Sequence, residues 1–196
     1  MSLFEFTFGL SAVILGLALA QIASAISRLA LAGRRVRWAP EPLLLAGIIV
    51  LVTVSVWLGQ WGLRNDTETT IGAMLMQVGK LMLPFMAAMF VLPDPLPDEG
   101  PIDLYAHYDR TRGLTYGVLI AGLIAFWIVG LMDWAGGGRP SLGPLTLWGA
   151  IARSPWLFCV GYGLMIVVRI RWLNILLLTA GLLYYGWEVI PTRLAG

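Results

Sequence analysis

The chain has 196 residues, of which 59% are hydrophobic and 12% are charged, and its formal net charge at pH 7 is +2. A soluble domain is about half apolar and carries roughly twice this share of charged residues, so the composition excludes an ordinary water-soluble globular domain. The low net charge and the lack of a long basic run also exclude a disordered tail and a nucleic-acid-binding arm. The sequence therefore predicts an all-α, polytopic membrane protein that forms a single helical bundle over residues 1–196.

Six apolar segments follow one another along the chain, each about long enough to cross the roughly 30 Å hydrocarbon core of a bilayer. We expect these spans over residues 5–27, 42–63, 71–92, 113–133, 147–169 and 172–190. Arg153 and Pro155 interrupt the fifth span. Ser154 followed by Pro155 is typical of a helix start, so the alternative is a span that begins at Ser154 after a short surface helix over 144–152.

Positive charge gathers in alternate loops of this arrangement. Met1–Glu5 carries no positive side chain, so the first segment is expected to be an uncleaved helix rather than a signal peptide. Loops one, three and five hold eight arginines, at positions 28, 34, 35, 37, 110, 112, 169 and 171, whereas the opposite side holds three. The positive-inside rule then places these loops in the cytoplasm and both termini on the non-cytoplasmic side. Twelve arginines against one lysine favour a bacterial source, and hence a multi-pass protein of the bacterial inner (plasma) membrane.

The third loop, residues 93–112, is the longest polar segment and is rich in proline and acidic residues. Prolines at positions 93, 95, 97 and 101 predict an extended first half, since proline restricts its own backbone and that of the preceding residue. The second half, 101–112, is compatible with one short helix. We expect this loop to form an acidic patch on the cytoplasmic side.

Lys80 is the charged residue that stands near the middle of a predicted span. It lies about ten residues, or roughly 15 Å, from either end of segment 71–92, too far for its side chain to reach water along the helix. Burying an ammonium there costs about 2.5–3.5 kcal/mol on insertion scales, so we expect a polar partner, an anion or a cavity. Gln77 and Pro84 share its helical face. One interpretation is an anion-binding position on a permeation path; the other is a lysine held by polar groups of a static bundle or a subunit interface.

Softer polar positions occur in other spans. Gln21 with Ser24 and Arg28, Thr53 with Trp57 and Gln60, and Asn174 with Tyr184 or Tyr185 each share one helical face. These positions are candidates to line a path, but they are equally typical of hydrogen bonds between helices. Small residues also recur at helical spacing and predict close helix packing, within the chain or with another subunit. They are Gly9, Gly16, Ala20, Ala23 and Ser27 in the first span and Gly117, Ala121 and Ala125 in the fourth.

Several chemistries lack the residues that they need. One cysteine, Cys159, and one histidine, His107, are too few for a zinc site, an iron–sulfur cluster or a haem in the bilayer. Asp103 and His107 are four residues apart without a third ligand, and we expect a solvated ion pair there. The phosphate-binding loop, the zinc-protease motif and the serine-hydrolase elbow are missing from the sequence. We expect no cofactor, no metal, no catalytic residues and no nucleic-acid partner.

These observations favour a small membrane transporter or channel for a small solute or ion. The ligand-path candidates are Lys80, Gln77, Gln60, Thr53 and Gln21. The alternative is a non-catalytic subunit that assembles with other membrane proteins. Besides the lipid bilayer, we expect further copies of the chain or other membrane subunits as partners. A lipid-modifying enzyme ranks third, because polar residues beside the membrane could act on lipid headgroups but show no catalytic pattern.

Overall fold

The computed structural model describes residues 3–63, 71–97, 99–135 and 155–189. Almost all of these residues are helical, which confirms the predicted all-α class. The α-helices within these ranges are α1 (Leu3–Ala32), α2 (Pro40–Gly59), α3 (Ile71–Val91), α4 (Leu104–Ala135), α6 (Pro155–Val167) and α7 (Arg171–Val189). Two 3-10 helices, η1 (Gly33–Arg35) and η2 (Gln60–Leu63), and two short strands, β1 (Val36–Arg37) and β2 (Ile102–Asp103), complete the described elements.

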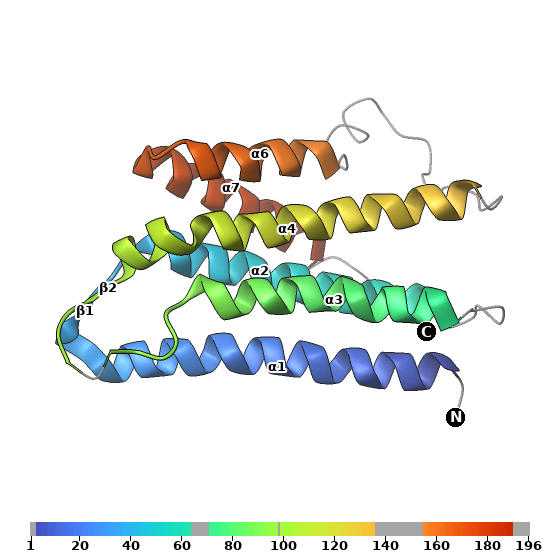
Figure 1. Ribbon diagram of the computed structural model, residues 1–196, viewed down its shortest axis with the longest axis horizontal. Coiled ribbons are helices and arrows are strands. Elements are labelled where there is room, and N and C mark those ends of the chain that lie inside the picture. Colours follow the sequence, from blue (N-terminus) through green and yellow to red (C-terminus); the bar gives the residue numbers. More distant parts are fainter. Residues whose placement is uncertain (1–2, 64–70, 98, 136–154, 190–196) are drawn as a thin grey trace.

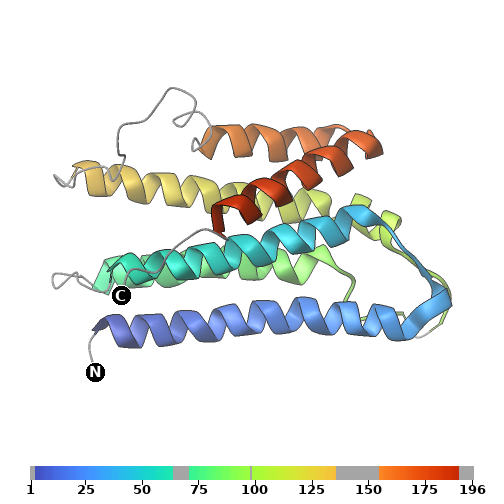
Figure 2. The same cartoon turned by 180° about the vertical axis from the view of Figure 1, so that it is seen from behind.

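The helices form a layered bundle in which successive elements run in opposite directions (Figure 1). Helix α1 packs against α2 and α3, α3 against α4, α2 against α7, and α4 against α6. Both views place β1, β2 and the turn between α6 and α7 at the same end of the bundle (Figure 2). We call this end, formed by residues 33–37, 93–103 and 168–171, the strand end.

Three helical segments are long and apolar enough to cross a membrane, namely Glu5–Arg35, Pro40–Gly59 and Leu104–Ile128. Two shorter apolar helical segments cover Val78–Val91 and Trp156–Val167. The described part of the chain therefore has the helices of a membrane protein, as the composition predicts. This finding confirms membrane-spanning helices. The number of six spans and the side of the membrane on which the termini lie stay predictions.

The strand end is tied together by a short parallel strand pair. Helix α1 ends at Ala32 and is followed by Gly33, whose φ of +55° is a left-handed backbone conformation that glycine adopts without steric cost. The chain then turns so that Val36 pairs with Ile102 and Arg37 with Asp103. Val36 and Ile102 are both buried. This pairing joins the loop after α1 to the segment that leads into α4.

Helix α4 is longer than the sequence predicts, and the reason is local. The carboxylate oxygen Oδ1 of Asp103 accepts hydrogen bonds from the backbone N–H groups of Tyr105 and Ala106, at 2.8 and 3.2 Å. Asp103 is thus the N-cap of α4, and the helix continues without a break into the apolar segment. The separate short helix expected within 101–112 is therefore wrong, because those residues form the first turns of α4.

The fifth predicted span, 147–169, is described only in part. Helix α6 begins at Pro155. This matches the alternative prediction, in which the fifth span starts at Ser154 with Pro155 at the first helical position. Residues 144–154, including the predicted surface helix, lie outside the described residues.

Except for Ala125, which is half-buried, the small residues predicted for close packing do not face the inside of the bundle. Gly9, Gly16, Ala20, Ala23 and Ser27 of α1 are all exposed, and so are Gly117 and Ala121 of α4. The buried face of α1 is a different one and includes Ser11, Ile14, Ala18, Ile22, Ala25 and Leu29. Within the described part of the chain, the small-residue face of α1 is not covered by another helix.

Candidate functional site

Lys80 lies at the middle of the bundle's third helix. It is the tenth of the 21 residues of α3, so roughly 15 Å of helix extends on either side of it. Pro84 lies one turn further along and has no backbone N–H to offer the Lys80 carbonyl. An amine and a carbonyl that lacks its usual helical donor therefore occur at the same depth of α3.

A cavity of about 50 Å³ opens beside Lys80 between α2, α3, α4, α6 and α7. Its polar groups come from Lys80, Tyr162 of α6 and Tyr185 of α7. Its apolar wall is formed by Val52, Val56, Leu83, Pro84, Val118, Leu119, Gly122, Leu123 and Phe126. The site thus combines one cationic group and two hydroxyls with an apolar lining, which is the usual composition of a small-molecule site.

Two interactions hold the polar groups of this cavity. The Lys80 Nζ atom lies 4.8 Å from the centre of the Phe126 ring, within the range of a cation–π interaction. Tyr162 and Tyr185 share a side-chain hydrogen bond. The two hydroxyls are donors and acceptors at once, so the cavity presents groups that can bind an anion or a hydrogen-bond acceptor.

Of the five predicted path residues, Lys80 is the one whose described side chain lines this cavity. Gln77 belongs to α3, but its side chain lies outside the described part of the structure. The Thr53 hydroxyl is buried and donates to the Ile49 carbonyl at 2.6 Å, a bond within its own helix. Gln60 is buried in η2, away from the cavity lining. A shared path through all five residues stays a prediction.

Gln21 has a different role in the structure. Its side-chain amide donates to Asp94 Oδ2 at 2.9 Å, and Arg28 reaches the same oxygen at 2.6 Å. Gln21 and Arg28 therefore lie on one face of α1, as predicted, and together hold the segment that follows α3. Arg35 adds hydrogen bonds to the carbonyls of Pro97 and Gly100 at 2.9 and 3.1 Å. These contacts anchor the acidic loop to the end of α1.

Sequence reasoning missed a buried polar row between the strand end and the cavity. Tyr108 and Tyr116 of α4 are buried, and their hydroxyls are 2.9 Å apart in a hydrogen bond. The Tyr116 ring stacks on Tyr162, with ring centres 5.6 Å apart and planes at 28°. Tyr162 then bonds to Tyr185 in the cavity. The signal in the sequence was weak, because these tyrosines belong to three different helices.

Two buried charges stand at the beginning of this row and were also missed. Glu41 in the first turn of α2 is 1% exposed, and Arg112 of α4 is 6% exposed. Both act electrostatically on the Tyr108 hydroxyl. Glu41 Oε2 and Arg112 Nη1 are buried and make no hydrogen bond within the described structure. Their positions near helix ends made them look like ordinary interfacial charges in the sequence.

Asp103 and His107 do not form the expected ion pair. Asp103 pairs with Arg37 at 3.2 Å, while His107 Nε2 lies 3.1 Å from the Phe90 carbonyl oxygen. Hydrogen bonds from the backbone N–H of Ala106, together with that of Tyr105 and the Arg37 guanidinium, hold the pKa of Asp103 below its ordinary value of 3.8, against the opposing effect of burial. In the described part of the chain, no three His, Cys, Asp or Glu side chains are grouped to hold a metal ion.

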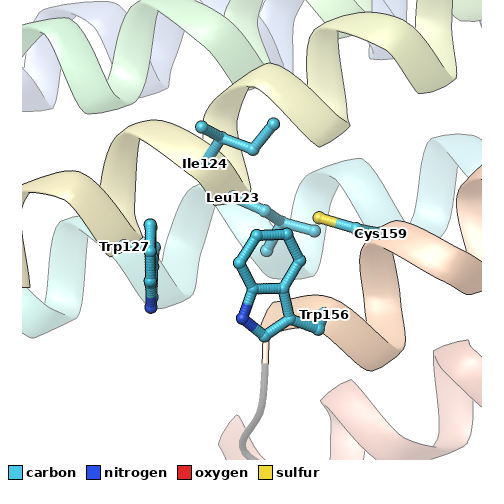
Figure 3. A pocket seen from close by; sticks show the side chains of 5 residues that line it. All are labelled: Leu123, Ile124, Trp127, Trp156 and Cys159. Carbon is cyan, nitrogen blue, oxygen red and sulfur yellow. The ribbon is translucent and has the colours of Figure 1, made fainter.

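A second, smaller pocket of about 10 Å³ lies between α4 and α6. Figure 3 shows Leu123, Ile124 and Trp127 from α4 facing Trp156 and Cys159 from α6, with the Cys159 sulfur directed toward Leu123. The Trp127 and Trp156 rings meet edge to face, 5.2 Å apart. The surface that lines this pocket is apolar, so it has less to offer a charged ligand than the Lys80 cavity.

Comparisons with models of protein families, with curated proteins and with solved structures found no match.

Proposed function

We propose that the chain is a small integral membrane transporter or channel whose path includes the cavity at Lys80. The observation that carries this proposal is the position of Lys80, which lines a cavity shared by five helices at the middle of α3. A charged residue at this depth is costly unless it faces a polar cavity or a partner, and such residues commonly mark ion and solute pathways.

The cavity supports a small anion or weak acid as the solute. The Lys80 amine supplies positive charge, the hydroxyls of Tyr162 and Tyr185 can donate hydrogen bonds, and valine and leucine side chains form an apolar wall. Among the described residues that line the cavity, none is acidic. Monovalent ions of the size of chloride, nitrate or formate fit both the charge and the small volume.

We further propose that all six described helices cross the inner membrane, with the strand end in the cytoplasm. Support comes from the alternating helix directions and from the arginines at positions 28, 35, 37 and 171, which gather at the strand end. Helix α6 has 13 residues and is about 20 Å long, shorter than the hydrocarbon core. Local thinning of the bilayer accommodates a short span at modest cost.

Uptake by reconstituted liposomes tests the proposal. Purified protein should take up at least one anion from a panel of chloride, nitrate, formate and acetate above the background of empty liposomes. Lys80→Met should lower this uptake about 10- to 100-fold, the effect of losing a contact to a charged group worth about 1.5–3 kcal/mol. Met86→Leu, an exposed residue of the same helix, is the matched control and should transport like wild type.

Background uptake across the whole panel by correctly folded protein would contradict the proposal. Equal uptake by wild type and Lys80→Met would remove Lys80 from the path.

The uncovered small-residue face of α1 favours the assembly subunit as a second candidate. Gly9, Gly16 and Ala20 are exposed, and an added Cβ at either glycine would meet no atom within 4 Å. Such a face allows close approach of another helix in the bilayer. Gly16→Leu should lower the fraction of oligomer in cross-linking experiments with native membranes if this face is an interface, and should leave it unchanged if lipid covers the face.

A further inference from the structure

The ends of the candidate membrane spans mark the level at which the strand end meets the membrane surface. Segment Glu5–Arg35 finishes at this end of the bundle, whereas Pro40–Gly59 and Leu104–Ile128 both start there. Arg37 lies between the first two spans, and Tyr105 is the second residue of the third. These two residues therefore stand at the depth of the lipid headgroups, where cationic and aromatic side chains are favoured.

Two arginines from distant parts of the chain share one aromatic ring at this depth. The guanidinium carbon of Arg37 lies 5.4 Å from the centre of the Tyr105 ring, and that of Arg171 lies 4.3 Å from the same point. Both distances are within the range of a cation–π interaction. The two guanidinium carbons are therefore at most about 10 Å apart, the sum of these distances. We call this group, Arg37, Tyr105 and Arg171, the arginine–tyrosine site.

Both guanidiniums keep N–H groups that the described residues do not use. Arg37 donates to Asp103 Oδ2 at 3.2 Å through Nη1, and a guanidinium has five N–H groups in total. Arg171 Nη2 lies 4.0 Å from Asp109 Oδ2, an ion pair longer than a hydrogen bond. The side chains of Arg37 and Arg171 are 70% and 54% exposed. They can thus donate to an anion outside the protein, and the planar fork of arginine matches the oxygens of a phosphate.

Each of these arginines is followed directly by an exposed tryptophan. Trp38 is 43% exposed and Trp172 is 67% exposed. Trp38 lies two residues before the start of α2, Trp172 is the second residue of α7, and these two helices pack against each other. An indole combines an apolar body with a polar N–H group, so it is favoured between headgroups and acyl chains. The two neighbouring pairs therefore offer cations to a headgroup and apolar surface to its chains.

We propose that the arginine–tyrosine site binds the phosphate group of an anionic phospholipid, with Trp38 and Trp172 beside its glycerol and acyl chains. The phosphodiester supplies negative charge and acceptor oxygens for the two guanidiniums, which Tyr105 positions. Phosphatidylcholine carries the same phosphate but adds a quaternary ammonium that the arginines repel. The site therefore selects lipids with a net negative charge. It does not depend on the solute or on transport through the Lys80 cavity.

Lipid titration of the purified protein in a nonionic detergent, followed by native mass spectrometry, tests the site. Dioleoylphosphatidylglycerol should bind more tightly than dioleoylphosphatidylcholine. Arg37→Gln and Arg171→Gln should each weaken phosphatidylglycerol binding about tenfold, the low end of what hydrogen bonds to a charged group contribute. Arg34→Gln is the matched control, because it removes the same charge from an exposed position at the same end. This variant should bind phosphatidylglycerol like wild type.

Two changes at Tyr105 separate positioning from charge, because neither alters the net charge. Tyr105→Phe keeps the ring and should bind phosphatidylglycerol like wild type. Tyr105→Leu removes the ring that holds both guanidiniums and should weaken binding about two- to fivefold, the effect of one exposed cation–π contact. Circular dichroism and melting temperature show whether each variant folds. If Arg37→Gln does not fold, Arg171→Gln and the two Tyr105 variants carry the test.

Equal affinity of the wild type for the two lipids overturns the site. Equal loss of phosphatidylglycerol binding in Arg34→Gln and Arg171→Gln also overturns it, because net charge alone would then attract the lipid. Displacement of bound phosphatidylglycerol by excess inorganic phosphate would identify a site for soluble anions and contradict the lipid assignment. Lipid that is retained in phosphate, and lost in Arg171→Gln and Tyr105→Leu but not in Arg34→Gln, supports the proposal.

Discussion

At the scale of single residues, the hydrogen bond between Tyr108 and Tyr116 is the clearest buried polar contact of α4. The two hydroxyls are 2.9 Å apart, and the rings meet nearly at right angles with centres 6.4 Å apart. Removing one hydroxyl leaves the other buried without a partner, whereas removing both does not. The energetic cost of the two single changes should therefore exceed that of the double change.

We predict that Tyr108→Phe lowers the free energy of unfolding by about 1–3 kcal/mol, the cost of an unsatisfied buried polar group. The double variant Tyr108→Phe/Tyr116→Phe should be less destabilised than the sum of the two single variants. Chemical unfolding in mixed micelles measures all four free energies. Additive effects would show that the two hydroxyls do not interact.

Asp103 makes stability at the strand end depend on pH. Its pKa in the folded state is lowered, chiefly by the Ala106 N–H, so the ionised carboxylate stabilises the fold. This contribution is fully present above the ordinary pKa of 3.8 and is lost as the pH falls below that value through the folded-state pKa. Asp103→Asn keeps a capping side chain but cannot ionise.

We therefore expect the gap in melting temperature between wild type and Asp103→Asn to be constant between pH 5 and 7 and to shrink below about pH 4. Thermal unfolding in detergent over this pH range gives the comparison. A gap that does not change between pH 7 and pH 3 would contradict the assigned role of the carboxylate.

At the scale of elements, Asp94 joins the loop after α3 to α1. Gln21 and Arg28 both donate to its Oδ2 atom. We predict that Asp94→Ala increases hydrogen exchange and proteolytic cleavage in segment 93–101, because that segment loses two side-chain contacts to α1. Glu99→Ala, an exposed acidic residue of the same loop, is the control. Equal protection in the two variants would show that Asp94 does not anchor the loop.

The sequence predicts the helices better than it predicts their contacts. The apolar run of 71–92 matches α3 within one residue, because the bilayer sets the length of an apolar helix. The predicted start of the fourth span at residue 113 lies too late for the helix, because the N-cap at Asp103 lets α4 begin within the polar segment. Lys80 was predicted because a charged residue within an apolar run can be recognised in the sequence alone. Tyr185 was one of the candidate polar positions, whereas Tyr162 and Glu41 were missed because only packing brings them close to it.

At the scale of the whole molecule, the strand end gathers segments that are far apart in sequence. We predict that Arg34→Cys, Glu99→Cys and Ile170→Cys, each in a Cys159→Ala background, react with a membrane-impermeant thiol reagent from the same side of the membrane. All three residues are exposed and belong to this end of the bundle. By the positive-inside rule that side is the cytoplasm, so inverted membrane vesicles should be labelled and intact cells should not. Labelling of one of the three positions from the opposite side would contradict their placement at the same end of the bundle.

The pairing of Arg37 with Asp103 spans 66 residues of chain and has a consequence for synthesis. A ribosome adds about 5–20 residues per second, so residue 103 follows residue 37 by about 3–13 s. Helix α1 precedes that interval, and α2 and α3 are made during it, before the arginine-rich segment 33–37 can pair with its strand partner. The strand pair can therefore form only after translation has reached α4, when the first three helices have already been made.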